Sequence, residues 1–302
     1  GRDPKKGRRV LCSGTQVKYA FVKEQIDNYT VIALCSALKV SRSGYYNWLH
    51  RTPSRREIKN KALVNVIAGV HKETMQTYGS PRMHAELVDT GYDVSIGRVE
   101  RLMSKNNLAA KQGKKNKQRQ QHRNGIAPVA NILDRQFMAN LPNEKWVSDI
   151  TFIETREGFL YLAVILDLFS RAIIGWSMSH KIDERLVQGA LSMAVERRDV
   201  REGLLLHSDQ GSQYKAKGYQ QRLSDLSITC SMSRKGECHD NAVAESFFHS
   251  LKTELICDQV YQSRPVARQS IFKYIELFYN RKRRHSTLDY QAPLNFEIMN
   301  AA

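Results

Sequence analysis

Five short apolar runs, rich in β-branched and aromatic residues, constrain the fold of the second half of this chain. They cover residues 146–153, 159–166, 172–178, 204–208 and 228–232. The first three are joined by short links, which predicts an antiparallel meander. A predicted helix at 184–197 separates the third run from the fourth, and the last two runs alternate with helices, which predicts parallel pairing. We therefore expect an α/β domain with a mixed five-stranded sheet.

Three acidic residues stand where a carboxylate is awkward unless it takes part in chemistry. Asp149 lies in the first apolar run, Asp209 closes the fourth, and Glu245 lies one turn into a predicted helix over 240–255. Asp209 and Glu245 have 35 residues between them. Carboxylates gathered from two strands and a helix supply the oxygen ligands that hard divalent cations take. A pair of such ions can clamp the attacking and leaving oxygens of a phosphoryl displacement.

Other titratable residues near these acids admit a structural role. A lone aspartate at a strand end is more often a turn former than a ligand. We predict that Asp167 closes a turn with Ser170 and Arg171. If the strand that supplies the first metal ligand is not the one that carries Asp149, Asp167 is the alternative ligand. His207 and His239 are candidate general bases. We favour an orienting or structural role for both, since a metal itself lowers the pKa of bound water.

The positive charge of the chain is concentrated in its first 130 residues. They carry 25 Lys/Arg against 9 Asp/Glu, whereas residues 131–302 carry 22 against 21. A net charge of +16 on one half predicts that this half holds a polyanion. Binding should then weaken steeply with salt, because neutralised phosphates release counterions. Charge alone does not exclude a basic surface that only keeps the protein soluble, or a protein that binds RNA.

Two local basic runs extend this prediction. Residues 111–124 hold six Lys/Arg, no acid and no apolar side chain, which predicts a solvated linker. Within this linker, Lys114 and Lys115 are candidate contacts to the DNA backbone. The four consecutive basic residues at 281–284 favour phosphate contacts by Arg281, Arg283 and Arg284.

Composition favours a cytoplasmic protein, associated with the nucleoid if its partner is DNA. No apolar run of about 18 residues is present, so no membrane span is expected. The basic, polar start lacks the apolar segment of a signal peptide. The five cysteines form no CxxC pair and favour reduced thiols.

Residues 17–55 predict a first helix-turn-helix. Helical spacing of apolar residues is followed by a turn and a short helix that Ser41 can cap. Arg42, Ser43 and Asn47 are the candidates for the DNA groove, whereas Tyr45 and Trp48 are expected to pack inside.

Residues 56–110 predict a second helix-turn-helix. A long helix leads to a turn where Ser80 can cap the next helix, with Pro81 in its first turn. A further helix, capped by Ser95, carries Arg98 and Arg101 as candidate DNA contacts.

The predicted helix at 240–255 has a definite phase. Asp240 is its candidate N-cap. Asn241, Glu245 and Lys252 fall within about 40° of each other at the border of its apolar face. Lys252 can therefore touch a phosphate beside the acids, or be an ordinary surface lysine, and Asn241 can support the helix start. The polar loop before the helix presents Arg234 and Lys235 as further DNA contacts.

Eight segments in order from Lys18 to Phe296 resemble the DDE transposases and retroviral-type integrases. The match is closest to bacterial transposases of the insertion-sequence-three family, in the product of the second reading frame. The segments are KYAFVKEQ, SRSGYYNWL, YGSPRMHAEL, KWVSDITFI, LDLFSRAIIGWSMS, HSDQGSQY, DNAVAESFFHSLKTEL and YNRKRRHSTLDYQAPLNF.

This resemblance implies a ribonuclease-H-like catalytic core after helical DNA-binding domains. It implies two Mg²⁺ ions, replaceable by Mn²⁺, with Asp149 bridging them, Asp209 completing one site and Glu245 the other. The implied substrates are terminal inverted repeats and target DNA, and the implied active form is a homo-oligomer. The helix-turn-helix and leucine zipper of the family's first frame have no counterpart here. The implied division is a tail or junction at 1–16, helix-turn-helix domains at 17–55 and 56–110, a linker at 111–129, the catalytic domain at 130–260 and a helical basic tail at 261–302.

Two other functions remain open at this point. A sequence-specific DNA-binding regulator with vestigial acids would account for the basic half, although not for a complete triad at this spacing. A structure-selective nuclease of the same fold would not need tandem recognition helices.

Overall fold

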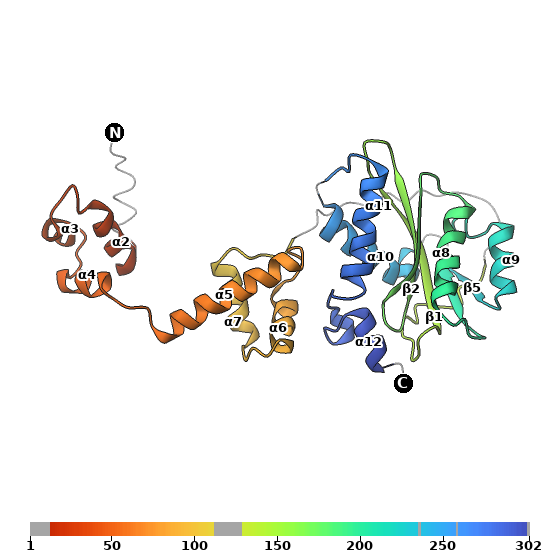
Figure 1. Cartoon of the computed structure of the whole chain (residues 1–302), viewed down its shortest axis with the longest axis horizontal. Helices are drawn as coiled ribbons and strands as arrows, with labels where there is room; N and C mark the ends of the chain where they lie inside the picture. Colours follow the sequence, from red (N-terminus) through yellow and green to blue (C-terminus); the bar gives the residue numbers. More distant parts are fainter. Residues whose placement is uncertain (1–12, 112–128, 235–236, 258, 301–302) are drawn as a thin grey trace. The chain divides into compact units, whose positions relative to one another are not determined.

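The computed structural model describes residues 13–111, 129–234, 237–257 and 259–300. Lys114, Lys115 and Lys235 lie outside the described residues, so their DNA contacts stay predictions. The chain divides into two compact units, Gly1–Leu63 and Val64–Ala302. The division falls within helix α5, Arg55–Glu73 (Figure 1).

The first unit is a small bundle of α2 (Thr15–Gln25), α3 (Val31–Ala37) and α4 (Arg42–Leu49). Its core is formed by Tyr19, Val22, Leu34, Cys35, Leu38 and Tyr45. The predicted cap of α4 is confirmed, because the Gly44 N–H donates to the Ser41 hydroxyl at 3.3 Å. Tyr45 is buried, and Trp48 stacks on it with 6.2 Å between ring centroids, as predicted.

The second unit begins with a helical part that contains most of α5 together with α6 (Ser80–Asp89) and α7 (Ile96–Lys105). The predicted cap by Ser80 is wrong, since α6 already includes this residue and Gly79 precedes it without a side-chain bond. Ser95 does precede α7, but its hydroxyl makes no capping bond either. Ser95 and Ile96 are exposed, so water can satisfy the free N–H groups of this first turn.

A five-stranded sheet follows, in the order β3-β2-β1-β4-β5. β1 pairs antiparallel with β2, and β2 with β3, whereas β4 runs parallel to β1 and β5 parallel to β4. The predicted meander and parallel pairs are therefore confirmed, and this mixed sheet is that of a ribonuclease-H-like core. The strands are β1 (Lys145–Ile153), β2 (Leu160–Asp167), β3 (Ile173–Ser179), β4 (Leu205–Ser208) and β5 (Thr229–Met232).

Helices cover both faces of the sheet (Figure 1). α8 (Glu184–Arg197) and α9 (Lys217–Asp225) pack on one face through a core that includes Trp146 and Leu191. Gly175 permits the close approach of α8, because a Cβ there would lie 2.3 Å from the Ala190 carbonyl oxygen. The other face is covered by α10 (Ala242–Leu251) and α11 (Arg264–Phe272), and α12 (Pro293–Asn300) ends the described chain.

The helix predicted at 240–255 is interrupted at both ends. A 3₁₀ turn, η1 (Cys238–Asn241), precedes α10, and a π-helical turn, η2 (Lys252–Ile256), follows it. A second π-helical turn, η3 (Lys273–Tyr279), follows α11. Asp240 is not the N-cap of α10, so that prediction is wrong. Its buried carboxylate instead accepts bonds from Arg135 and Arg234, which are stronger than a bond to a free N–H.

Two predictions from composition can be compared with the structure. Among the described helices, none combines the length and apolar character of a membrane span. In the part of the chain that the structure describes, Cys35 is a buried free thiol and Cys230 a half-buried one.

Candidate active site

The register of β1 and β4 brings Asp149 and Asp209 to neighbouring positions. Val147 on β1 lies opposite His207 on β4 in the parallel pair. Each acid follows its strand residue by two positions, so the same register continued sets Asp149 opposite Asp209 on the same face. The antiparallel neighbour of Asp149 on the other side is Val164, in the middle of β2.

Glu245 reaches this region from α10, which packs against β1. The start of α10 is tied to the strand by Asn241, whose side-chain amide donates to the Ser148 carbonyl oxygen at 3.1 Å. Ser148 is held in turn, because its hydroxyl donates to the Val164 carbonyl oxygen at 2.9 Å and bonds to the Tyr214 hydroxyl at 2.8 Å. The residue before Asp149 is thus bonded to three separate elements, which makes the position of Asp149 rigid.

The carboxylates influence each other electrostatically. Desolvation raises the pKa of Asp149 well above its usual value, and the charges of Asp209 and Glu245 raise it further. Asp209 is open to solvent on one side, yet nearby protein atoms remove enough water to raise its pKa as well. Desolvation also raises the pKa of Glu245. Negative charge is therefore costly at this site unless a cation accompanies it.

The donor set suits a hard divalent cation, although its side chains are not gathered around a single point. Within the described residues, no group of three acidic, histidine or cysteine side chains is arranged to hold a metal ion. Asp149 and Asp209 each use Oδ1 to accept a backbone N–H, from Ile150 at 2.7 Å and Gly211 at 3.0 Å. The Asn241 side-chain oxygen is buried and has no hydrogen-bond partner among the described residues, so it is a further hard oxygen near β1.

The environment of His207 matches an orienting role better than that of a general base. Its Nδ1 lies 2.8 Å from the Ser231 hydroxyl and its Nε2 lies 3.1 Å from the Ser233 hydroxyl. The side chain is fully buried, and desolvation lowers its pKa to about 4. A neutral imidazole with both nitrogens bonded holds β4 and β5 together at the end that carries Asp209.

Asp240 organises the loop before α10, a role that the sequence did not predict. Its carboxylate accepts bonds from the Arg234 backbone N–H at 2.9 Å, from the Arg135 side chain at 2.7 Å and from Asn131 at 2.9 Å. The Arg234 guanidinium also bonds to it, and this contact is the largest of those that lower the pKa of Asp240. The carboxylate is thus held as an anion between two arginines whose side chains are 43% and 51% exposed.

Family models and curated relatives match almost the whole chain. Residues 139–238 and 245–300 match two models described as "Integrase core domain", and residues 57–116 match "HTH-like domain". The chain is 40% identical over 288 residues to "Transposase InsF for insertion sequence IS3A" of Escherichia coli (strain K12), covering 95% of this chain and 100% of that protein. The chain belongs to the insertion-sequence-three (IS3) family of transposases.

Other relatives agree with the IS3-family assignment. The chain is 42% identical over 254 residues to "Transposase for insertion sequence element IS904" of Lactococcus lactis subsp. lactis (strain IL1403), covering 84% of this chain and 100% of that protein. Among solved structures, it is similar to the HTLV-2 integrase catalytic core domain in complex with magnesium (trimeric form). That similarity has 17% identity and a TM-score of 0.39, and it covers 52% of this chain and 97% of the other.

In this IS3-family chain, the predicted recognition residues of the first unit face solvent. Arg42, Ser43 and Asn47 on α4 are all exposed. The Ser43 hydroxyl bonds to that of Ser41 at 2.8 Å, at the start of the helix. The exposed side of α4 also carries Tyr46, an aromatic residue that is 46% exposed and was not predicted to face solvent.

Arg98 and Arg101, the predicted recognition residues of the second unit, lie on α7. Arg101 is exposed, and its side chain folds back to donate to the Gly97 carbonyl oxygen at 3.0 Å. Arg98 is half-buried on the same helix.

Lys252 lies in η2, where desolvation lowers its pKa and the charge of Asp149 opposes this change. The lysine and the aspartate therefore interact.

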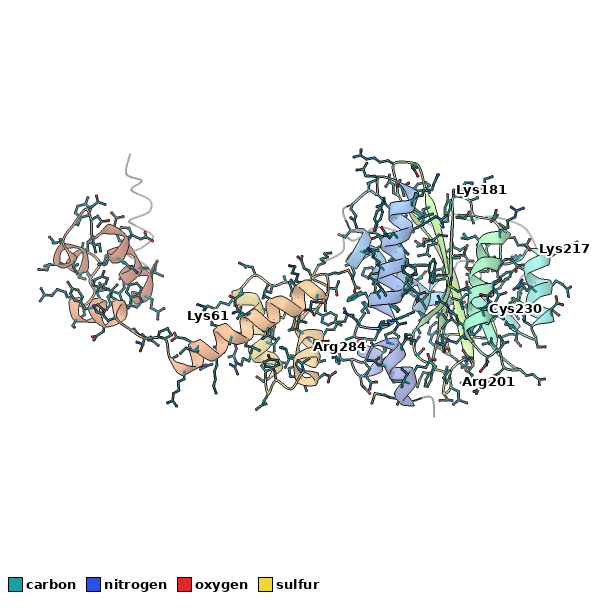
Figure 2. All side chains as sticks on the ribbon, in the orientation of Figure 1. Lys61, Lys181, Arg201, Lys217, Cys230 and Arg284 are labelled. Atoms are coloured by element: carbon teal, nitrogen blue, oxygen red, sulfur yellow. The ribbon has the colours of Figure 1, made fainter. Side chains whose placement is uncertain are left out.

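The DNA contacts predicted for Arg283 and Arg284 are not retained. The side chain of Arg283 is 4% exposed, and its guanidinium bonds to Glu254. That of Arg284, which is labelled in Figure 2, is 13% exposed and bonds to Glu86 and Asp89 of α6 at 2.6 Å each. Both cations are neutralised by acids within the protein and have little surface left for a phosphate.

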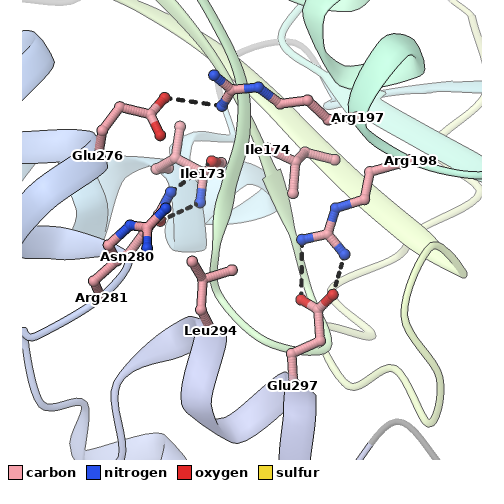
Figure 3. A pocket seen from close by; sticks show the side chains of 9 residues that line it. All are labelled: Ile173, Ile174, Arg197, Arg198, Glu276, Asn280, Arg281, Leu294 and Glu297. Atoms are coloured by element: carbon pink, nitrogen blue, oxygen red, sulfur yellow. Dashed lines mark hydrogen bonds and ion pairs between the residues drawn. The ribbon is translucent and has the colours of Figure 1, made fainter.

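Arg281 differs from its two neighbours, because it is exposed and lines a cavity of about 460 Å³ (Figure 3). Two other arginines of this cavity are paired: Arg197 bonds to Glu276 at 2.8 Å and Arg198 bonds to Glu297. The cavity lies where β3 begins, beside Ile173, and none of the predicted metal ligands lines it.

Asp167, the last residue of β2, has the structural environment that was predicted. It is fully buried and accepts the backbone N–H groups of Asn143 at 2.8 Å and Phe169 at 2.9 Å. The Arg171 N–H bonds to its carbonyl oxygen at 2.8 Å and closes the turn. Burial raises the pKa of the carboxyl to about 6. Its neighbour on β1 is Trp146, three positions from Asp149.

Proposed function

We infer that this chain binds the terminal inverted repeats of an insertion sequence and catalyses metal-dependent cleavage and joining of DNA strands. The observation that carries the proposal is the register of β1 and β4, which ends two residues before Asp149 and Asp209, together with the charges of Asp209 and Glu245, which both raise the pKa of Asp149. The IS3-family relatives support the same activity.

Asp149, Asp209 and Glu245 are the residues that would hold the cofactor. A pair of Mg²⁺ ions, or Mn²⁺ in their place, would supply charge stabilisation for the attacking and leaving oxygens of an in-line displacement. Asp149 would act as a ligand together with both Asp209 and Glu245, since the charges of both raise its pKa. Oδ2 of each aspartate is available, since Oδ1 accepts a backbone N–H.

The chain's own residues then position the DNA. Lys252 brings a cation close to Asp149 and can contact the scissile phosphate. Asn241 keeps the start of α10 against β1, and His207 keeps β4 against β5. Because the nucleophile is first water and then a DNA 3′-OH, the same residues serve cleavage and joining without a covalent bond between protein and DNA.

The helical domains would supply recognition of the repeats. Arg42, Ser43 and Asn47 on α4, and Arg98 and Arg101 on α7, are the proposed groove contacts. Arg234, Arg281 and Lys252 are the proposed phosphate contacts near the catalytic core. An insertion sequence has two ends that must be bound together, so a homo-oligomer on DNA is the proposed active form.

A strand-transfer assay tests this proposal. The full chain is incubated with labelled inverted-repeat ends, Mg²⁺ and a supercoiled plasmid. The proposal predicts labelled ends covalently joined to the plasmid, with none formed in EDTA. Tight binding of ends without metal-dependent nicking or joining would favour a DNA-binding regulator. Cleavage of branched DNA without preference for the ends would favour a structure-selective nuclease.

A further inference from the structure

Two exposed aromatic side chains lie at the end of β1 that follows Asp149. Phe152 is 54% exposed and Phe159, just before β2, is 46% exposed. Their rings meet edge to face, with 5.1 Å between centroids, and Phe159 also lies 6.3 Å from Tyr161. Two apolar rings that stay in water at one place are costly to the folded chain unless they have a partner.

Hydrogen bonds hold the backbone of the hairpin turn between the two rings. The Thr155 hydroxyl donates to the Gly158 carbonyl oxygen at 2.6 Å across the turn. The Arg156 N–H donates to the Tyr261 carbonyl oxygen at 2.9 Å, and the Arg264 side chain donates to the Phe159 carbonyl oxygen at 3.2 Å. The backbone that carries the two rings is therefore held in one conformation.

Lys252 connects these rings to the candidate active site. Its Nζ lies 5.2 Å from the centroid of the Phe152 ring, and its charge interacts with that of Asp149. Phe152 follows Asp149 by three positions on β1, roughly 10 Å along the strand, and alternation turns the two side chains to opposite faces of the sheet. Lys252 is therefore the residue that links them, and a DNA strand whose phosphate contacts Lys252 would pass the rings.

We propose that Phe152 and Phe159 form a stacking site for an unpaired DNA base beside the catalytic acids. The inference rests on the proposed function, since it assumes DNA at those acids. Planar bases of any sequence stack on aromatic side chains, and a neighbouring cation holds the phosphate of the same nucleotide. Bases inside a duplex already stack on each other, so the site accepts a base only at a frayed end or in a single strand.

Fluorescence anisotropy in EDTA tests the proposal without any strand chemistry. The probes are a blunt duplex and the same duplex with a three-nucleotide thymidine overhang. We expect Phe152→Ala to weaken binding of the overhang duplex about tenfold and to leave the blunt duplex unchanged. A third duplex carries an overhang of the same length without bases. The wild-type chain should bind it as weakly as the Phe152→Ala chain binds the duplex with the thymidine overhang. Phe159→Ala should act in the same direction.

Phe272→Ala is the matched control. Phe272 is 44% exposed and pairs with Trp176 at 6.0 Å, on the strand at the edge of the sheet. It should change neither affinity.

Three results would overturn the stacking site: equal losses on both duplexes for Phe152→Ala, no loss on either, or an overhang without bases that binds like thymidine. Sedimentation could instead show that Phe152→Ala abolishes self-association of the chain. If the affinity for DNA then did not depend on the bases of the overhang, the rings would belong to a protein interface. Failure of the proposed function is distinguishable. A wild-type chain that prefers the thymidine overhang but never joins DNA in Mg²⁺ would refute the strand transfer and leave the stacking site in place.

Discussion

Arg283 and Glu254 form an ion pair that is almost completely removed from water. Their side chains are 4% and 7% exposed, and the guanidinium donates to the carboxylate through Nε at 2.8 Å and Nη2 at 2.6 Å. The Tyr274 hydroxyl donates to the same carboxylate at 2.7 Å, and Arg82 of α6 lies 3.7 Å from it. This pair joins the C-terminal segment to η2, the turn that follows the helix carrying Glu245.

Removal of Arg283 should destabilise the second unit severely. Arg283→Ala leaves the Glu254 carboxylate buried without its main partner, and breaking a buried pair in this way costs about 3–5 kcal/mol. Urea unfolding followed by circular dichroism measures the change in the free energy of unfolding.

The exposed neighbour of Arg283 supplies the control. Arg281→Ala should stay within about 0.5 kcal/mol of the wild type, because its side chain faces solvent. Equal stability of the two variants would contradict a structural role for Arg283.

Asp209→Asn should abolish DNA joining while the affinity for inverted-repeat ends is unchanged. The substitution keeps the volume and the Gly211 contact but removes the negative charge that a cation needs. Joined product on a gel and end binding by anisotropy measure the two properties. Asp225→Asn, which alters an exposed carboxylate at the end of α9, should retain both. Loss of end binding by Asp209→Asn would mean that recognition and catalysis are not separate.

Asn241→Ala should slow joining by about tenfold, as expected when a group that orients a catalytic side chain is lost. The Asn241 amide ties the start of α10 to the Ser148 carbonyl oxygen, one residue before Asp149. The rate of joining at saturating DNA should fall, whereas the affinity for ends should not. An unchanged rate in a folded Asn241→Ala chain would remove this residue from the site.

Asp167 should make the stability of the second unit depend on pH. Its pKa is about 6 in the folded chain and near 3.8 when unfolded, so the folded state binds the proton more tightly. This contribution is fully present below about pH 4, is lost as the pH rises to about 6, and amounts to about 3 kcal/mol. The free energy of unfolding of the wild type, relative to Asp167→Asn, should therefore fall between those pH values. A difference that does not vary with pH would contradict the shift.

Local pattern was sufficient to predict the sheet. The β-branched and aromatic runs, and the lengths of the links between them, predicted the five strands and both kinds of pairing. The helix Glu184–Arg197 lies at the predicted residues, and its cap is also local, since the Asp183 side chain accepts the Leu186 N–H. The cap expected from Asp240 was not found because Arg135 and Arg234 bind its carboxylate, while Ser80 lies within α6 and Ser95 makes no capping bond.

Long-range partners explain most of the remaining differences. Arg283 and Arg284 lie in a basic run, and the sequence gives no sign that Glu254, Glu86 and Asp89 neutralise them. Asp240 pairs with Arg135, which is 105 positions away. The sequence also did not indicate the exposed pair Phe152 and Phe159, because alternation alone does not tell which aromatic rings remain uncovered.

The central claim is that three carboxylates act together on divalent cations, and manganese binding measures this most directly. The full chain, bound to inverted-repeat DNA, is titrated with Mn²⁺ while the electron paramagnetic resonance signal of the free ion is followed. Asp149→Asn, Asp209→Asn and Glu245→Gln should each weaken ion binding by about tenfold or more, since even outer partners of metal ligands are worth that much. Asp225→Asn should bind like the wild type. If the three variants bind Mn²⁺ as tightly as the wild type, these carboxylates do not form the metal site.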